Sequence, residues 1–503
     1  MAESSTAGEN AAGISVDVLI VGAGFSGLGM AIKLLEAGMK DFLLIEKSDE
    51  IGGTWYENRY PGCACDVPSH LYSFSFESNA GWTRMFASQP EILQYLKSCV
   101  ERYGLAPYIR LNTRFNGAAW DESLGMWRIK AGEDLRIQAR VLVSGIGALH
   151  VPHYPEIPGV ERFSGPAFHS ATWQPEVELT GKTVAVVGTG ASAIQFVPRI
   201  APSVGKLYLF LRTPPWIVPR RDFGISEKWR KHFQSVPGLM WAFRKFIFFG
   251  LEWRVLGFLG NRLVRGVGAR IARRHLEKSI ADAKLRAALT PKYELGCKRV
   301  LLSDDFYPAL NRPNVEVVTE RIAEIRERSI VTREGTERPV DVLIYGTGFQ
   351  VTDQFIGMRL VGRGGLEIHD AWRKGMSAHL GVTVSGFPNL FILLGPNTGL
   401  GHNSVVLMIE AQVRYVIKCL KLMRRRNLAV MEVRAGAQQE FAINIQRRMS
   451  RTVWQTGGCH SWYQDTQTGE NTALWPGSVI SYIRTTRSVS PSEYELRPAP
   501  PTT

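Results

Sequence analysis

The stretch VDVLIVGAGFSGLGMAIKLLEAGMKDFLLIEK at residues 16–47 decides the fold. Its apolar, β-branched start at 16–21 is typical of a buried parallel strand and leads directly into Gly22-Ala-Gly24-Phe-Ser-Gly27. A helical pattern follows as far as Gly38, and a second apolar strand then ends at Glu46. This order of strand, glycine turn, helix, strand and acid predicts a Rossmann unit that binds a dinucleotide.

Each feature of such a unit has a physical role in this sequence. Gly22 allows the tight turn, Gly24 lets the backbone approach a pyrophosphate, and Gly27 lets the helix pack closely on the strand. Glu46 accepts hydrogen bonds from ribose hydroxyls and disfavours a 2′-phosphate, so the site suits FAD or NAD rather than NADP. The predicted contacts here are Gly22, Gly24, Phe25, Ser26, Gly27, Glu46 and Lys47.

The same pattern returns at residues 182–213. The apolar strand KTVAVV leads into Gly188-Thr-Gly190-Ala-Ser-Ala193, and the next strand, KLYLFL, ends in Arg212-Thr213 instead of an acid. A guanidinium and a hydroxyl can bind a 2′-phosphate, which favours NADPH, although Arg212 could also be a surface residue at a strand end. The predicted contacts are Gly188, Thr189, Gly190, Ala191, Ser192, Arg212 and Thr213.

Two dinucleotide sites in a chain of 503 residues predict an α/β protein with two Rossmann-like dinucleotide-binding domains and a helical insertion. The expected division is a disordered tail at 1–15, an FAD-binding domain at 16–148 and 380–503, an NADPH-binding domain at 149–224 and 297–379, and the insertion at 225–296.

Six cysteines are too few for a disulfide scaffold, and the small, polar opening residues do not look like a secretory signal. We therefore expect a reducing, cytoplasmic location. Cys63 and Cys65 lack a second Cys/His pair at metal-site spacing, so no metal site is expected. Pyridine-nucleotide disulfide reductases also have two Rossmann units, but they need a redox-active cysteine pair after the first glycine turn. The CxC spacing of Cys63 and Cys65 argues against that class.

Half of the net charge of +14 gathers between Arg244 and Arg274, where eight basic residues and one acidic residue alternate with aromatic ones. Charges interrupt every long apolar run, so a membrane-spanning helix is not expected. The segment is either a helical insertion whose apolar side faces a substrate channel, or a helix for weak membrane-surface or partner binding. No motif indicates nucleic-acid binding. A monomer or a homodimer is expected.

Residues 163–175, FSGPAFHSATWQP, resemble the FxGxxxHxxxW fingerprint of type I Baeyer–Villiger monooxygenases, within the flavin-containing monooxygenase superfamily. Residues 52–66, GGTWYENRYPGCACD, resemble a second pattern of that family, and the resemblance covers roughly residues 16–485. Gln174 stands where the family usually has Pro or Asp. An N- or S-oxygenating or hydroxylating flavin monooxygenase of the same superfamily is therefore the alternative.

The resemblance implies a monooxygenase that uses FAD, NADPH and O₂ to convert ketones to esters or lactones through a C4a-peroxyflavin. It implies that Arg299 is catalytic, and a permanently charged guanidinium can stabilise a peroxide anion and the oxyanion that follows. Asp66 would orient Arg299 if the two lie within hydrogen-bond reach. His169 and Trp173 are expected to have conformational roles. The implied cofactor contacts are Gly53, Thr54, Trp55, Asp66, Tyr72, Lys298, Thr347, Gly348, Asn397 and Trp462.

From spacing alone, Lys298 and Arg299 could equally be two solvated charges at the start of a strand.

Overall fold

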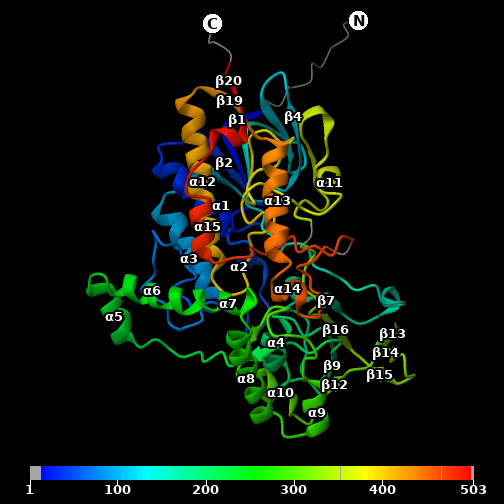
Figure 1. Cartoon of the computed structure of the whole chain (residues 1–503). Coiled ribbons are helices and arrows are strands. Elements are labelled where there is room, and N and C mark those ends of the chain that lie inside the picture. Colours follow the sequence, from blue (N-terminus) through cyan, green and yellow to red (C-terminus); the bar gives the residue numbers. More distant parts are fainter. Residues whose placement is uncertain (1–12, 352, 466, 500–503) are drawn as a thin grey trace, which may run out of the picture.

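The computed structural model describes residues 13–351, 353–465 and 467–499. Its first large sheet contains the first glycine-rich unit, with β1 paired in parallel to β2 and β6 (Figure 1). The second half of β1 is buried, as expected of a parallel strand covered on both faces. In spatial order the strands are β17 (Arg359–Val361), β4 (Phe115–Asp121), β5 (Met126–Ala131), β6 (Leu135–Ser144), β1 (Ile14–Val21), β2 (Phe42–Ile45) and β3 (Ile109–Arg110), and β18 (Leu390–Ile392) also pairs with β6.

Helices from distant parts of the chain pack together beside this sheet. α1 (Phe25–Glu36) is apolar and mostly buried, and it lies along α12 (Val405–Arg425), which in turn contacts α15 (Val479–Thr485). α2 (Thr54–Glu57) packs against α3 (Gln89–Arg102). The helix that follows the first glycine turn is thus held by the C-terminal part of the chain.

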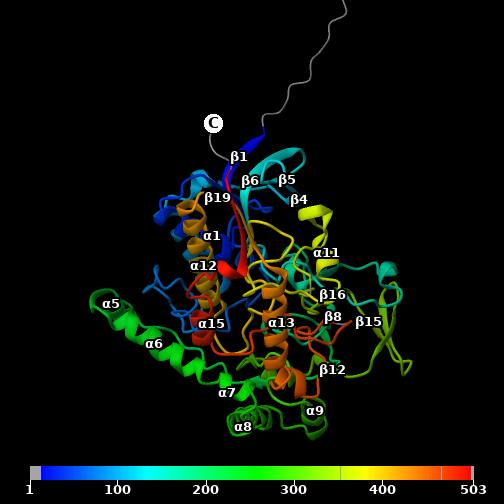
Figure 2. The same ribbon diagram turned by 45° about the horizontal axis from the view of Figure 1, so that its top comes forward.

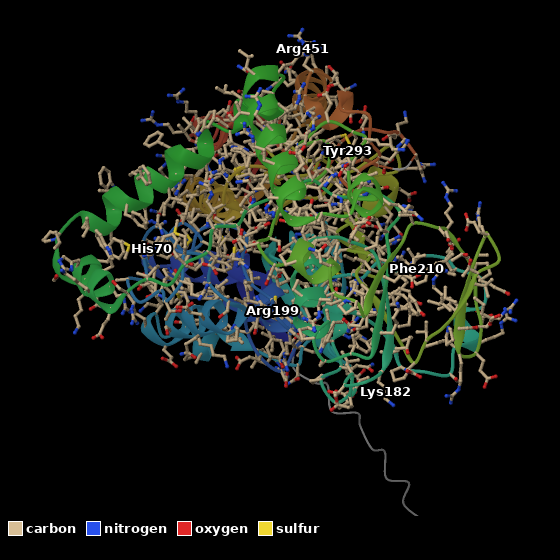
Figure 3. The ribbon with its side chains drawn as sticks, turned by 90° about the horizontal axis from the view of Figure 1, so that it is seen from below. His70, Lys182, Arg199, Phe210, Tyr293 and Arg451 are labelled. Atoms are coloured by element: carbon tan, nitrogen blue, oxygen red, sulfur yellow. A yellow bond between two sulfur atoms is a disulfide. The ribbon has the colours of Figure 1, made fainter. Side chains whose placement is uncertain are left out.

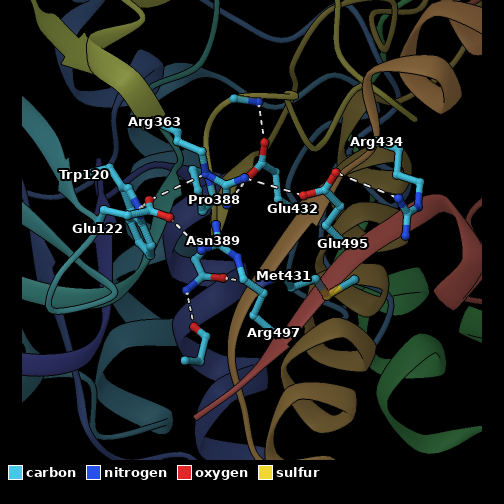
Figure 4. Close-up of polar contacts among 12 residues, drawn as sticks. Trp120, Glu122, Arg363, Pro388, Asn389, Met431, Glu432, Arg434, Glu495 and Arg497 are labelled. Atoms are coloured by element: carbon cyan, nitrogen blue, oxygen red, sulfur yellow. Dashed lines mark hydrogen bonds and ion pairs between the residues drawn. The ribbon is translucent and has the colours of Figure 1, made fainter. Parts of the chain in front are cut away.

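A polar network joins the C-terminal strands to the first sheet (Figure 4). β19 (Leu428–Val433) and β20 (Tyr494–Pro498) pair in an antiparallel ribbon. Buried Asn389 donates to the carbonyls of Arg140 and Ala429, and its side-chain oxygen accepts from the Met431 N–H at 2.8 Å. Arg363 forms an ion pair with Glu432 at 2.6 Å. The far end of the chain is therefore part of the first domain's framework.

The second large sheet contains the second glycine-rich unit and is parallel throughout. α4 (Ala193–Ile200) packs against α10 (Phe306–Leu310) beside it. In spatial order its strands are β12 (Val315–Val318), β9 (Lys206–Phe210), β8 (Thr183–Val187), β16 (Val342–Tyr345) and β7 (Ala167–His169). A separate antiparallel sheet is formed by β13 (Ile322–Ile325), β14 (Ser329–Thr332) and β15 (Glu337–Pro339).

The expected insertion is helical, and α5 and α6 project from the body as an arm in Figures 1 and 2. Two buried charges anchor the arm: Arg244 donates to the Ser73 hydroxyl at 2.7 Å, and Glu252 accepts from Asn403 at 2.8 Å. None of the described helices is long and apolar enough to cross a bilayer. The helices are α5 (Glu227–Ser235), α6 (Leu239–Glu252), α7 (Val255–Phe258), α8 (Arg262–Ser279) and α9 (Ala283–Ala288).

The predicted fold class is confirmed: the chain is α/β, with two dinucleotide-domain sheets, the first mixed and the second parallel, and a helical insertion. The boundaries differ in two places. β1 begins at Ile14, within the predicted tail, whose residues 1–12 lie outside the described part. β17 pairs with β4, so the chain has rejoined the first sheet by Arg359 rather than at residue 380. A strand as short as β17 shows too little periodicity in the sequence to predict that the chain returns to the first sheet there.

Candidate functional site

The first glycine turn has the close packing that its sequence predicts. A Cβ on Gly27 would lie 1.9 Å from the Gly22 carbonyl oxygen, so only glycine fits there. A Cβ on Gly24 would meet no atom closer than 3.6 Å outside its neighbours, so packing within the chain does not require that glycine. The Glu46 carboxylate, at the end of β2, accepts from the Ala23 N–H at 2.7 Å. Space beside Gly24 and a buried acid at the turn suit a pyrophosphate and a ribose.

Aromatic side chains from the second family pattern lie near this turn. A Cβ on Gly53 would lie 3.1 Å from the Gly24 Cα, which places the Gly53-Thr54-Trp55 segment against the turn. The Trp55 indole N–H donates to the Tyr72 hydroxyl at 3.2 Å, and Tyr72 meets Phe25 edge to face. Buried Ser26 follows in the first turn of α1.

Lys47 forms an ion pair with Glu57 at 3.1 Å, so in this structure its ammonium is directed to a carboxylate. Its expected contact with the first cofactor stays a prediction.

The second glycine turn is more open than the first. A Cβ on Gly188 would lie 2.5 Å from the Gly346 carbonyl oxygen, which puts this turn directly beside the Thr347-Gly348 turn. Gly190 and Ala191 are exposed, while Thr189 and Ser192 are half-buried. The Thr347 hydroxyl donates to the His153 carbonyl, which ties the turn to the preceding linker. An exposed loop of backbone N–H groups is suited to a cofactor that binds and leaves.

Two cations meet beyond this turn. Arg212 follows β9 and is exposed, next to half-buried Thr213. Burial lowers the pKa of Lys298, and the charge of Arg212 lowers it further. Neither Arg212 nor Lys298 forms an ion pair with a carboxylate in the described residues. Two adjacent positive charges without an acidic partner form a site for an anion such as a 2′-phosphate.

Arg299 and Asp66 lie within hydrogen-bond reach. Nε and Nη2 of Arg299 donate to the same oxygen, Oδ2 of Asp66, at 3.0 and 2.6 Å. The Asp66 charge raises the pKa of Arg299 further above its usual range, against the opposing effect of burial, so the guanidinium stays protonated. Both side chains are half-buried. Arg299 is thus a cation held in a fixed direction, with its Nη1 free of Asp66.

The loop that carries Asp66 is fixed by residues that the sequence analysis did not single out. Gln195 on α4 donates to the Ala64 carbonyl at 2.9 Å and accepts from the Tyr60 hydroxyl at 3.0 Å. Arg220 donates to the Cys65 carbonyl at 3.0 Å. These contacts join the two dinucleotide-binding units at the point where Asp66 meets Arg299.

Cys63 and Cys65 are buried free thiols. Burial raises the pKa of Cys63 to about 11 and that of Cys65 further still, so both remain protonated at neutral pH. A protonated, buried pair is unsuited to thiol–disulfide chemistry.

His169 is fully buried at the end of β7, where its Nδ1 accepts from the Ala171 N–H at 3.1 Å. Burial lowers its pKa to about 4, so the imidazole is neutral at neutral pH. Its ring packs against Phe349, beside the Gly348 turn, while half-buried Trp173 packs against Phe196 of α4. These contacts are consistent with conformational roles and give His169 no acid–base role.

The C-terminal segment closes over the site. The Asn397 amide donates to the Asn471 carbonyl at 2.7 Å, and Trp462 is 45% exposed. Its neighbour Tyr463 is buried beside Arg299, whose charge partly offsets the increase that burial causes in the pKa of Tyr463.

Cys297 and Cys459 form a disulfide, although the cysteine content did not predict one. The two cysteines are 162 residues apart, and at that distance the spacing of cysteines in the sequence does not indicate which of them pair.

A family model described as flavin-binding monooxygenase-like matches residues 15–363. A Baeyer–Villiger monooxygenase from Pseudomonas aeruginosa is 49% identical over 483 residues, which cover 96% of this chain and 92% of that protein. Another, from Streptomyces coelicolor, is 44% identical over 494 residues, covering 96% of this chain and 93% of that one.

Solved structures of the same kind match the whole fold. Cyclohexanone monooxygenase from Rhodococcus sp. Phi1 bound to NADP⁺ superposes with a TM-score of 0.87 at 28% identity, covering 97% of this chain and 100% of that one. Oxidised steroid monooxygenase bound to NADP gives 0.86 at 28% identity, with coverages of 96% and 100%.

Proposed function

The chain belongs to the flavin-binding monooxygenase-like family as an FAD- and NADPH-dependent Baeyer–Villiger monooxygenase, and we propose that its Arg299–Asp66 pair is the group that assists oxygen insertion into a ketone. The single observation that carries this assignment is the double hydrogen bond from Arg299 to one oxygen of Asp66. The products are esters or lactones, according to whether the ketone is open or cyclic.

The residues of both glycine turns fit the two cofactors. The turn at Gly24 and Glu46 would hold FAD, and the open turn at Gly190, with Arg212 and Lys298, would hold NADPH. Once both are bound, they supply the reducing equivalents and the activated oxygen. Everything else in the reaction depends on how the chain's own residues bind, orient and shield the reacting groups.

Arg299 supplies a positive charge that does not give up its proton. Negative charge develops on oxygen as the substrate carbonyl is attacked, and a preoriented cation stabilises that charge more than the neutral ground state. Asp66 fixes the direction of the guanidinium through Nε and Nη2, which leaves Nη1 available for the reacting oxygen. Asp66 therefore positions Arg299.

Product analysis separates this reaction from N- or S-oxygenation and hydroxylation. The purified chain would be given NADPH, O₂ and a mixed panel of aliphatic, cyclic and aryl ketones and thioethers. We expect esters or lactones from at least one ketone class. Sulfoxide or alcohol as the only product would instead assign the chain to the alternative reactions of its superfamily.

A second role, binding to a membrane surface, is favoured by the exposed side of the arm that contains α6. Figure 3 shows this arm from below, with His70 labelled beside it. Trp241, Phe246, Phe249 and Trp253 are 65%, 75%, 57% and 51% exposed, and Lys245 lies among them. Exposed aromatic rings interleaved with cations are typical of surfaces that bind anionic lipid. We propose weak, reversible membrane-surface association of an otherwise cytoplasmic enzyme.

Vesicle flotation tests this second role. The enzyme should float with vesicles containing phosphatidylglycerol at low salt, and less with pure phosphatidylcholine or at high salt. The double variant Trp241→Ser/Phe246→Ser should lose binding, whereas Leu124→Ser, which removes a 51% exposed leucine from the β4–β5 hairpin, should not. Absence of binding at low salt would exclude the proposal. Sedimentation would then show whether the same face makes a homodimer instead of a monomer.

A further inference from the structure

The Cys297–Cys459 disulfide joins two segments that both reach Arg299. Its Cα atoms are 6.1 Å apart, and it is the one bond of its kind among the six cysteines, since Cys63, Cys65, Cys99 and Cys419 are free. Cys297 directly precedes Lys298 and Arg299 in the sequence. Cys459 begins the segment that contains Trp462 and Tyr463. The bond therefore connects the catalytic segment to the segment that covers it.

Tyr463 is the residue through which the covering segment meets Arg299. Its side chain is 1% exposed and belongs to an apolar cluster with Cys297 and Trp454. Cys297 is two residues before Arg299, so this packing brings the Tyr463 ring to the Arg299 segment, and the Arg299 charge partly offsets the increase that burial causes in the pKa of Tyr463. The buried ring therefore occupies space beside the Arg299 segment that solvent would otherwise fill.

The two segments are closely packed at the disulfide. The Glu294 N–H donates to the Gly457 carbonyl at 2.9 Å, and a Cβ on Gly457 would lie 2.7 Å from the Cys297 Cβ. Two thiols need more room than one sulfur–sulfur bond, so breaking the bond must displace one of the segments. The covering segment is the one free to move, because Gly458 and His460 on either side of Cys459 are exposed.

We propose that Tyr463 is a positioning residue for Arg299, and that the Cys297–Cys459 disulfide is a redox-sensitive tether that holds it there. The proposal rests on the role assigned to Arg299. A dithiol transfers two electrons and two protons to the bond, which gives two cysteine thiols and the oxidised, disulfide form of the dithiol. Half-buried Cys459 is the accessible end. A disulfide in a reducing location is typically a redox sensor rather than a scaffold.

Loss of the tether uncouples the reaction. Without the Tyr463 ring, more water reaches the half-buried Arg299, and NADPH, O₂ and a proton are converted to NADP⁺ and hydrogen peroxide in place of ester. Hydride delivery from NADPH does not use Arg299, so the rate of FAD reduction stays the same. The signature of the tether is thus a change in the ratio of ester to peroxide at constant FAD reduction.

The test uses the full-length, FAD-loaded enzyme before and after treatment with dithiothreitol. Thiol titration in denaturant should count four thiols before treatment and six after it. Ester formed per NADPH should fall several-fold on reduction, with a matching rise in peroxide. The Cys297→Ser/Cys459→Ser variant should resemble the reduced enzyme with or without dithiothreitol, and Cys419→Ser should resemble the wild type. Six thiols before treatment, or equal ester yields in the two states, would overturn the proposal.

Substitution of Tyr463 isolates the positioning role from the bond. Tyr463→Phe keeps the ring and should keep both coupling and its sensitivity to dithiothreitol. Tyr463→Ala should give the uncoupled reaction even with the disulfide intact. Normal coupling in Tyr463→Ala would refute the role of Tyr463. If Arg299→Ala still makes ester, the proposed function itself is wrong. If Arg299→Ala loses ester formation, but the ratio of ester to peroxide in the wild type does not depend on the redox state of the disulfide, only the tether proposal is wrong.

Discussion

Arg299 donates from Nε and Nη2 to a single oxygen of Asp66, at 3.0 and 2.6 Å, and the two residues are 233 positions apart in the sequence. Asp66 belongs to the loop after α2, within the first dinucleotide-binding unit. Arg299 follows the helical insertion and precedes β11 (Leu301–Leu302). The pair therefore forms only when both dinucleotide-binding units are in place, at the junction where their two cofactors have to meet.

Replacing Arg299 by Ala should abolish ester formation while NADPH still reduces FAD. Removing a group that stabilises developing negative charge lowers kcat roughly 100- to 1,000-fold. Stopped-flow reduction without oxygen measures the first half of the reaction, and chromatography of the ester measures the second. Normal ester formation in this variant would remove Arg299 from the mechanism.

Asp66→Asn should weaken oxygen transfer less than Arg299→Ala does. The amide oxygen still accepts from the guanidinium but lacks the charge, and hydrogen bonds to charged groups contribute about 1.5–3 kcal/mol, so kcat should fall roughly 10- to 100-fold. The KM for NADPH should not change, because Asp66 is not part of the proposed phosphate site. A change confined to that KM would show that Asp66 acts on the cofactor instead.

Arg212→Ala and Lys298→Ala should each raise the KM for NADPH by about tenfold or more and leave the KM for NADH unchanged, because each removes a charge-assisted contact to the 2′-phosphate. Lys182→Ala is the matched control. Lys182 is an exposed cation just before β8, at the opposite end of the strands from Phe210, the last residue of β9 (Figure 3). Arg212 follows Phe210 by two residues. Equal increases in the KM for NADPH and the KM for NADH would mean that Arg212 and Lys298 do not bind the 2′-phosphate.

Local pattern was enough to predict the two Rossmann units, because each one lies within about 30 consecutive residues and its glycine turn has a strict steric requirement. Gly27 and Glu46 illustrate this, since both are fixed by contacts inside their own unit. The pairing of Asp66 with Arg299 was expected only through family resemblance. No rule of spacing would have joined them.

The parts that escaped prediction depend on contacts between distant segments. Gln195 has the ordinary place of a helix residue in the sequence, yet it binds Ala64 across the two units. The disulfide and Tyr463 depend on the packing of the C-terminal segment over Arg299. The return at β17 depends on a three-residue strand, which is too short to show a period.

His169 should make the enzyme less stable as the pH falls. Its pKa is about 4 in the folded chain and about 6.5 in the unfolded chain, so between these values the unfolded state binds the extra proton. Stability that is complete above pH 6.5 is therefore lost progressively toward pH 4. In His169→Asn this loss should be smaller. The comparison is the shift in urea midpoint between pH 7 and pH 5, and an identical shift in both proteins would contradict it.

Gly27→Ala should destroy FAD binding and lower the melting temperature. The added Cβ would lie 1.9 Å from the Gly22 carbonyl oxygen and 3.1 Å from its carbon, and backbone atoms cannot rotate away as a side chain could. Overpacking of this kind costs at least about 1–3 kcal/mol and here also distorts the turn that faces the pyrophosphate. Gly250→Ala is the control, because that helical glycine has no atom within 4 Å of its added Cβ and should gain about 0.5–1 kcal/mol. FAD absorbance after gel filtration and thermal unfolding measure both effects. If Gly27→Ala retained its FAD and its melting temperature, the close packing of α1 on the first glycine turn would have no part in holding the flavin.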